Sequence, residues 1–355
     1  MTLKLYLRPV APAAKSDSSS AARPLAGSDR SFERCEVILR GDGDAVRSDI
    51  LPLDRIDDWV TAQDSGLAGQ AEKTLEQLMR PRAAFAGLPM DRPAVMGIVN
   101  VTPDSFSDGG DRLDPEKAIA DGLAMWEAGA TLLDVGGEST RPGAEPVTEA
   151  EEAARVVPVI RGLSEAGARV SVDTRHAAVM RAAIEAGAAV VNDVTALEGD
   201  PDSLAVVAEA GVAVVLMHMQ GDPRSMQKAP MYNNVTLDVF DYLEKRVIAC
   251  IDAGISQDSI AVDVGIGFGK SIQHNLELID RLSIFHSFGL PVLLGLSRKS
   301  FIAKLSHGEA PKERLAGSLA GIAAGLLRGV QIYRVHDVPE TLQMIALWRA
   351  VEKSP

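Results

Sequence analysis

The chain has 355 residues, of which 46% are hydrophobic and 24% charged, and its formal net charge is −13. This length fits two domains or one large barrel with an appendage, and the acidic balance argues against binding to nucleic acid or to an anionic membrane surface. The two cysteines, Cys35 and Cys250, form no Cys-x-x-Cys pair, which argues against a disulfide framework or a thiolate metal site and favours the cytoplasm. The sequence contains no run of about 18 apolar residues, so no membrane-spanning helix is predicted. Arg8 and Pro9 interrupt the apolar core that a signal peptide would need.

The first 82 residues carry weak signals and are expected to form an N-terminal extension. Residues 1–30 are rich in Ala, Pro, Ser and Gly, a composition typical of a flexible segment. After them, the pattern predicts a strand over 34–39, a turn at GDGD, and helical periodicity over 69–80. We can assign no function to this region from its residues.

A repeated strand–helix pattern begins at residue 94. Pro115 stands where the first residue of a helix is expected, and EAGAT, EAGAR, EAGAA and EAGVA end four helical stretches with a glycine just before a strand. Eight apolar runs alternate with these helices and are predicted to be strands: 94–100, 130–136, 168–173, 189–193, 212–218, 259–265, 291–297 and 330–336.

Eight such units predict an α/β fold, a (β/α)8 TIM barrel over residues 83–355, whose buried parallel strands read as continuous apolar runs. An open, doubly wound sheet shows the same alternation and is the structural alternative. The chain has no dinucleotide fingerprint, which favours the barrel.

Polar residues stand at nearly every strand end. A single aspartate after a strand, such as Asp193, is more simply a cap of the following helix. Repetition on eight strands instead predicts one site, because a barrel brings the carboxyl ends of its strands to one rim. The residues concerned include Asn100, Asp134, Asp173, Asn192, Asp193, His218, Asp263, Ser297, Arg298, Lys299, Arg334 and His336.

The residue types narrow the chemistry of this site. Carboxylates and an amide at Asp173, Asn192 and Asp263 suit a flat heterocycle with several N–H donors and a carbonyl. The cationic set suits a phosphate-bearing ligand and comprises Arg141, Lys299, Arg334 and His336.

Two other patterns resemble known binding motifs but do not indicate a P-loop or a zinc site. GIGFGKS over 265–271 is not a P-loop, because Val264 stands where the first glycine is required. The histidines lack zinc-site spacing, and His218 is read as a rim histidine whose hydrogen bonds are satisfied within the protein.

Several motifs resemble the dihydropteroate synthase family, in order along residues 83–355: NVTPDSFSDGG, DVGGESTRPGA, SVDT, VNDV, LMHMQG, GFGK, SRKSF and RVHDV. The resemblance implies a (β/α)8 barrel that forms a homodimer. It implies a transferase of folate biosynthesis that joins 6-hydroxymethyl-7,8-dihydropterin diphosphate to p-aminobenzoate, giving 7,8-dihydropteroate and pyrophosphate, and that sulfonamides inhibit.

The resemblance also implies roles for individual residues. The pterin ring would be held by Asp173, Asn192, Asp263 and Lys299, with Asp134 also in the substrate site. The diphosphate would contact Thr140, Arg334 and His336, with Asn100 on Mg²⁺. The p-aminobenzoate pocket would be formed by Phe106, Thr140, Arg141, Pro142, Lys299 and Ser300. The residues given catalytic roles are Asp108, near the pterin methylene, Arg141 and Lys299, and segments 101–110 and 136–146 would close over the site.

The chain departs from the family pattern at Val264 and Ile266, where proline and phenylalanine are frequent, which puts the rigidity of that loop in doubt. A corrinoid-type methyltransferase barrel would share the pterin-binding residues but has no need of TPDSFSDGG, STRPG or SRKS. A non-catalytic pterin-binding relative would be expected to lose Asn100, Lys299 or the Arg334–His336 pair, which are all present. A second, pyrophosphokinase activity in residues 1–90 is disfavoured, because that segment is short and lacks a metal-binding pair of aspartates.

Overall fold

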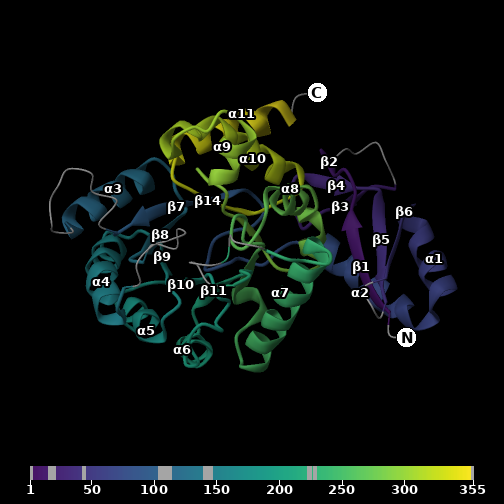
Figure 1. Ribbon diagram of the computed structural model, residues 1–355, viewed down its shortest axis with the longest axis horizontal. Helices are drawn as coiled ribbons and strands as arrows, with labels where there is room; N and C mark the ends of the chain where they lie inside the picture. Colours follow the sequence, from purple (N-terminus) through teal and green to yellow (C-terminus); the bar gives the residue numbers. More distant parts are fainter. Residues whose placement is uncertain are drawn as a thin grey trace.

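The computed structural model describes residues 3–14, 21–41, 45–102, 114–138, 147–221, 226 and 230–352. Its centre is a closed barrel of eight parallel strands (Figure 1). Because β14 pairs with β7, the sheet has no open edge, and the doubly wound alternative is wrong. The eight predicted strands are confirmed, within a few residues at their ends: β7 Ala94–Asn100, β8 Leu132–Gly136, β9 Val170–Asp173, β10 Val190–Asp193, β11 Ala213–Met217, β12 Ile260–Asp263, β13 Val292–Leu294 and β14 Ile332–Val335.

Helices surround the barrel as the outer layer. Pro115 is the first residue of α3, and Asp114 caps it by accepting the backbone N–H groups of Glu116 and Lys117. The predicted glycine caps are present, since Gly129, Gly167, Gly187 and Gly211 all adopt positive φ angles. The helices are α3 Pro115–Glu127, α4 Glu149–Glu165, α5 Ala177–Glu185, α6 Ser203–Ala210, α7 Val235–Asp252, α8 Ile272–Asp280, α9 Ser300–Leu305, α10 Leu315–Leu327 and α11 Val338–Glu352, with 3-10 turns η5 Gln257–Ser259, η6 Leu282–Phe288 and η7 Pro311–Glu313.

Two apolar layers stabilise the barrel. One fills its interior with side chains such as Met96, Leu132 and Val215, together with Phe85 and Met90 from the segment before β7. The other lies between the strands and the helices and is larger. Burial on both faces explains why the strands read as continuous apolar runs.

The extension is a small α/β unit. The antiparallel sheet β1–β5–β6 packs against two helices, and a second small sheet has the order β2–β4–β3. Its elements are β1 Lys4–Pro9, β2 Ala13–Ala14, β3 Arg23–Pro24, β4 Arg30–Phe32, β5 Arg34–Arg40, β6 Val46–Pro52, η2 Leu53–Arg55, α1 Ile56–Gln63, η3 Ser65–Leu67 and α2 Ala68–Met79.

The strand predicted over 34–39 and the helix predicted over 69–80 are confirmed as β5 and α2. The expectation of a flexible chain is wrong for residues 4–9, which form the buried strand β1. Leu5 and Leu7 face the extension's own core, whereas Tyr6 joins the outer core of the barrel. β1 is not predicted by the composition of residues 1–30 taken together, because a strand of six residues contributes little to that average.

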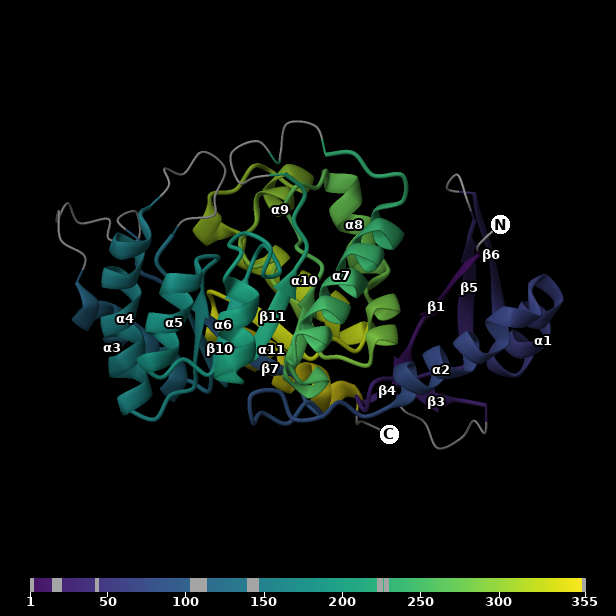
Figure 2. The ribbon, with the colours of Figure 1, turned by 90° about the horizontal axis from the view of Figure 1, so that it is seen from below.

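The extension lies beside α7 of the barrel (Figures 1 and 2), and its elements β1 and α2 contact η6. The Lys4 ammonium contacts Asp241 and Glu244, each at 2.5 Å, and the Arg40 guanidinium contacts Asp238 at 2.7 Å. These two cationic groups of the extension therefore meet carboxylates of α7. None of the described helices has the length and apolarity required to span a membrane.

Candidate active site

The parallel strands bring their carboxyl ends to one rim of the barrel. Apart from Asp134, which lies in the middle of β8, the predicted site residues within the described ranges come from the last two residues of these strands or from the segments that follow them: Asn100, Asp173, Asn192, Asp263, Lys299, Ser300, Arg334 and His336. The remaining predicted residues lie outside the described ranges: Phe106, Asp108, Thr140, Arg141 and Pro142.

Arg334 joins three strands of the rim. Its Nε donates to Asp134 Oδ2 at 2.5 Å, and its Nη2 donates to Asp173 Oδ2 at 2.6 Å. Asn192 Nδ2 donates to the same Asp134 oxygen at 3.0 Å. Charge-assisted bonds of this kind fix side-chain geometry more firmly than neutral ones.

Asp134 is the anchor of this network, because its residue is 0% exposed. Its carboxylate orients Asn192 and Arg334, and direct contact with substrate stays a prediction. The sequence signal was available, since an aspartate in the middle of an apolar strand is rarely buried without a cation partner.

Asp173 shows two opposing electrostatic effects. Burial raises its pKa to about 7, while the Arg334 guanidinium works in the opposite direction. The side chain is 16% exposed, so it remains accessible from the rim. The balance between burial and this guanidinium therefore sets the protonation state of Asp173.

Asp263 ends β12 and is followed by a glycine loop over residues 264–269. Its Oδ1 accepts the backbone N–H of Gly265 at 2.8 Å, and burial raises the pKa of its carboxyl. Gly265 and Gly269 adopt φ angles of +67° and +60°. A Cβ at either position would lie 1.9 or 2.3 Å from the carbonyl oxygens of His218 and Gln220, so these glycines are required by close backbone approach.

The departures from the family pattern, Val264 and Ile266, are both 0% exposed. Apolar burial holds these two side chains in the outer core. The loop is also tied by Gly267 N–H, which donates to Asn275 Oδ1 at 2.7 Å. These contacts supply restraint in a loop that lacks the family's proline.

Lys299 reaches the same loop from the segment after β13. Its Nζ donates to the carbonyl oxygen of Ile266 and lies 4.1 Å from the centroid of the Phe268 ring. Burial lowers the pKa of Lys299 to about 7, an effect that Asp263 opposes and Arg334 reinforces. Ser300, the next residue, is exposed at the start of α9.

His336 follows β14, and its ring is oriented by a neighbour. Its Nδ1 lies 3.0 Å from Ser297 Oγ, which also accepts the backbone N–H of His336 at 3.2 Å. Ser297 comes from the segment after β13, so two adjacent strand ends fix this imidazole.

Other rim residues serve the fold itself. Both oxygens of Asp193 accept bonds from the turn that follows, including the backbone N–H groups of Thr195 and Leu197 at 2.7 and 2.9 Å. Asp193 therefore serves the fold, but the prediction that it caps the following helix is wrong, because α6 begins at Ser203 and its N-cap residue is Asp202. His218 is buried and its Nδ1 lies 2.9 Å from Lys270 Nζ, in line with its reading as a satisfied histidine. Lys270 ends the GFGK motif, and no role for it is predicted from the sequence.

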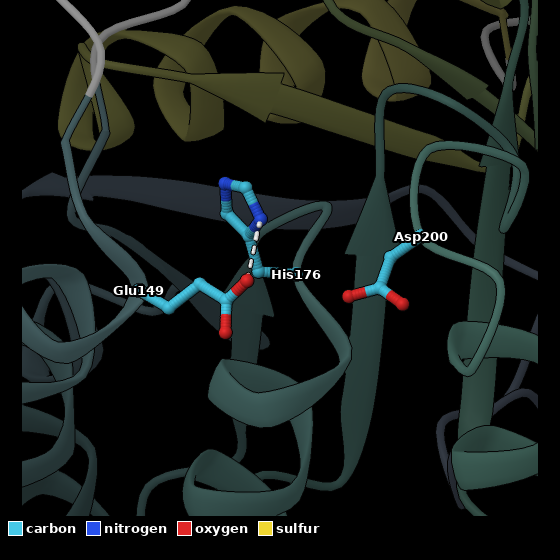
Figure 3. A group of neighbouring side chains, drawn as sticks. All are labelled: Glu149, His176 and Asp200. Carbon is cyan, nitrogen blue, oxygen red and sulfur yellow. Dashed lines mark ion pairs between the residues drawn. The ribbon is translucent and has the colours of Figure 1, made fainter.

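A separate group of titratable side chains lies at the beginnings of helices (Figure 3). Glu149, His176 and Asp200 place possible ligand atoms within 4.8 Å of one another. However, both Asp200 oxygens accept backbone N–H groups, from Ala177 at 2.9 Å and Asp202 at 3.0 Å. Glu149 is half exposed and lies 3.8 Å from His176 Nδ1. We therefore interpret these side chains as groups that stabilise the beginnings of helices and do not propose a metal site here.

Comparison with known proteins places the chain in a family. The sequence model of the pterin binding enzymes matches residues 96–336. The dihydropteroate synthase of Escherichia coli (strain K12) is 44% identical over 273 residues, covering 77% of this chain and 96% of the relative.

Two solved structures of similar proteins carry informative ligands. Dihydropteroate synthase from Xanthomonas albilineans in complex with 7,8-dihydropteroate is 45% identical, with a TM-score of 0.69 over 76% of this chain and 97% of that one. The Yersinia pestis enzyme in complex with a sulfonamide drug is 44% identical, with a TM-score of 0.72 over 75% of this chain and 97% of that one. With a barrel of this topology and a family match over most of its length, the chain belongs to the dihydropteroate synthase family of pterin-binding enzymes.

Proposed function

We propose that the chain is a dihydropteroate synthase of folate biosynthesis, which joins 6-hydroxymethyl-7,8-dihydropterin diphosphate to p-aminobenzoate and releases pyrophosphate. The observation that carries the proposal is the meeting of two chemistries at one rim. Carboxylate and amide groups of Asp173, Asn192 and Asp263 stand beside the cations Lys299 and Arg334. This combination suits a ligand with a hydrogen-bonding ring and a polyanionic tail.

The pterin ring requires acceptors for its N–H groups and donors for its carbonyl. An ionised carboxylate accepts two N–H bonds side by side, which suits Asp173 and Asp263, while an asparagine both donates and accepts. Asn192 Nδ2 is already turned toward Asp134, which leaves its carbonyl oxygen for a ligand donor. Lys299 would also donate to the ring.

The diphosphate requires cations. Arg334 uses Nε and Nη2 for its carboxylate partners, and a guanidinium has five N–H donors, so others remain for phosphate oxygens. We assign the diphosphate to Arg334, His336 and Thr140. Each charge-assisted bond contributes about 1.5–3 kcal/mol.

Mg²⁺ is the cofactor that we propose, and Asn100 would hold it. Asn100 ends β7 at the rim with a partly exposed side chain, and an amide oxygen is a suitable ligand for a hard cation. Magnesium at phosphate-transfer sites takes few protein ligands and completes its shell with phosphate oxygens and waters. When bound, it would neutralise charge on the diphosphate.

In the reaction, the bond between the pterin methylene and the diphosphate oxygen breaks, and its electron pair leaves with the diphosphate. The p-aminobenzoate nitrogen forms the new C–N bond and loses a proton. Arg334 and His336 would stabilise the negative charge that develops on the leaving group. Asp108 would face the electron-poor methylene, and closure of segments 101–110 and 136–146 would exclude water from it.

The p-aminobenzoate pocket is assigned to Phe106, Arg141, Pro142, Ser300 and the stem of Lys299, with Thr140 beside them. Arg141 would pair with the carboxylate of p-aminobenzoate. A sulfonamide resembles this substrate in shape and charge, so we propose that it competes for the same pocket.

We further propose a cytoplasmic homodimer. Leu347 and Val351 are 67% and 64% exposed and lie one turn apart on α11, where a second copy would cover them. Sedimentation of the wild type against a Leu347→Glu, Val351→Glu variant tests the dimer. A monomeric wild type contradicts it.

The test of function is pyrophosphate release by the purified chain, with dihydropterin diphosphate, p-aminobenzoate and Mg²⁺ each omitted in turn. Release that requires all three supports the synthase. Tight pterin binding without release would favour a non-catalytic relative, and methyl transfer from methyltetrahydrofolate would favour the corrinoid-type barrel.

A further inference from the structure

Lys270 is a buried lysine at the rim whose Nζ lies within hydrogen-bond distance of three polar atoms. The residue is 2% exposed. Its Nζ lies 2.9 Å from His218 Nδ1, 3.2 Å from the His218 carbonyl oxygen and 3.0 Å from the Phe268 carbonyl oxygen. Nζ donates to the two carbonyl oxygens and shares a proton with His218 Nδ1 in a direction set by the imidazole tautomer, while burial lowers the pKa of this lysine.

These polar atoms belong to two neighbouring strand ends. His218 follows β11, and its backbone N–H donates to the carbonyl oxygen of Asp263 at 3.1 Å. Phe268 lies in the glycine loop after β12. Lys270 therefore links the end of β11 to the loop over 264–269.

The same loop receives the stem and ammonium of Lys299. Besides the bond to the Ile266 carbonyl and the contact with the Phe268 ring, the Lys299 stem crosses Gly267 so closely that a Cβ there would lie 3.0 Å from Cδ. Lys299 thus depends on the backbone of Ile266, Gly267 and Phe268. Lys270 donates to the carbonyl oxygen of Phe268.

We propose that Lys270 is a positioning residue, which fixes the 264–269 loop so that the ammonium of Lys299 is held beside Asp263 for the pterin. This inference rests on the proposed pterin site, because the hydrogen-bond partners of Lys270 are His218 and Phe268 and its effect on Asp263 is electrostatic. Without its Nζ, the carbonyl oxygens of His218 and Phe268 would lose a buried donor, and the loop would shift to find replacements. Lys299 would move with the loop.

The test measures binding of dihydropterin diphosphate by calorimetry, without p-aminobenzoate, so that no turnover occurs. In Lys270→Met we expect affinity to fall about tenfold, because the loop that seats Lys299 is no longer fixed. Lys304→Met, an exposed lysine on α9, is the matched control and should bind as the wild type does.

A double-mutant cycle with Lys299→Met separates positioning from general damage. If Lys270 acts through Lys299, the double variant should bind within about threefold of Lys299→Met alone. Fully additive losses, or wild-type affinity in Lys270→Met, would overturn the proposal. Should Lys270→Met fail to fold, Lys270→Gln replaces it: its amide can still donate to both carbonyl oxygens, so we expect pterin affinity within about threefold of the wild type. A tenfold loss in this folded variant would contradict a role through these two bonds.

A second readout does not depend on pterin binding. Acetylation of Lys299 by an amine-selective reagent, followed by mass spectrometry across a pH series, reports the pKa of this lysine in each variant. Because burial lowers that pKa, we expect the midpoint of labelling to move to higher pH in Lys270→Met and to stay in Lys304→Met. An unchanged midpoint rejects the positioning role, whereas a wild type that binds no pterin rejects the proposed function instead.

Discussion

The two carboxylate oxygens of Asp263 have different partners. One accepts the backbone N–H of Gly265, and we propose that the other accepts an N–H group of the pterin. In Asp263→Asn, the side-chain NH2 group must face either the Gly265 N–H or an N–H group of the pterin, and both of these are donors. We expect the variant to lose about 2–4 kcal/mol of pterin binding, which is more than tenfold in affinity. Pterin titration calorimetry measures this, with the exposed Asp258→Asn as the control; a loss below tenfold removes Asp263 from the ring contacts.

The pH dependence of kcat/KM for the pterin substrate should be a narrow bell. Burial raises the pKa of Asp173 to about 7 and lowers the pKa of Lys299 to about 7. Activity should therefore rise as pH approaches 7 and Asp173 ionises, and fall above 7 as Lys299 loses its proton. In Lys299→Arg the cation stays charged, so the alkaline fall should disappear while the acidic limb remains. An alkaline limb that persists in this variant must belong to another group.

At this scale, the sequence was informative about residues at strand ends and uninformative about their partners. Asp173, Asn192, Asp263 and Arg334 could be placed at one rim because strand direction dictates it. The bonds of Arg334 to Asp134 and Asp173, and of Lys270 to His218, join residues from different strands, and their distances depend on the barrel's closure. No spacing in the sequence encodes them.

Among the elements, the glycine loop after β12 offers a matched pair of substitutions. Gly265 and Gly211 have similar φ angles, +67° and +64°, but a Cβ at 265 would lie 1.9 Å from the His218 carbonyl oxygen, whereas one at 211 has nothing within 4 Å. Gly211→Ala should cost about 1 kcal/mol of folding stability through backbone strain alone. Gly265→Ala should cost more and also weaken pterin binding, because the loop must move.

Chemical unfolding and pterin calorimetry on both variants check this prediction. The prediction is contradicted if Gly211→Ala and Gly265→Ala lose the same folding stability and Gly265→Ala binds pterin as the wild type does, because the loop would then accommodate a Cβ without disturbing the site.

The elements differ in how far the sequence predicted them. The eight barrel strands and their glycine caps were recognised because buried parallel strands give long apolar runs. β1 was missed because its six residues stand beside a segment of Ala, Ser and Pro, and only its partner β5 explains its burial. Short strands of this kind are stabilised by pairing that is distant in sequence.

On the scale of the whole molecule, the extension is joined to the barrel by both charge and packing. The Tyr6 ring meets Phe240 edge-on at 5.3 Å, and Phe240 stacks on Phe288 at 4.3 Å. The Tyr6 hydroxyl donates to Asp241 at 2.9 Å, and Arg82 Nη2 donates to the His286 carbonyl oxygen at 2.9 Å. The extension thus covers an aromatic surface between α7 and η6.

From the sequence alone, deletion of residues 1–82 is expected to leave an active barrel, since every proposed site residue lies beyond them. The contacts now argue that the deleted chain would keep its site but expose Phe240 and Phe288, so we predict a lower melting temperature and aggregation at concentrations where the intact chain stays in solution. Tyr6→Ala in the intact chain should cost about 3 kcal/mol by the same loss of packing, and Val46→Ala, exposed on β6, should cost little. Thermal unfolding and size-exclusion chromatography decide between the two expectations. If the truncated chain melts with the intact one, residues 83–355 fold independently and the extension is an appended unit; if it melts earlier, the extension is part of the folded enzyme.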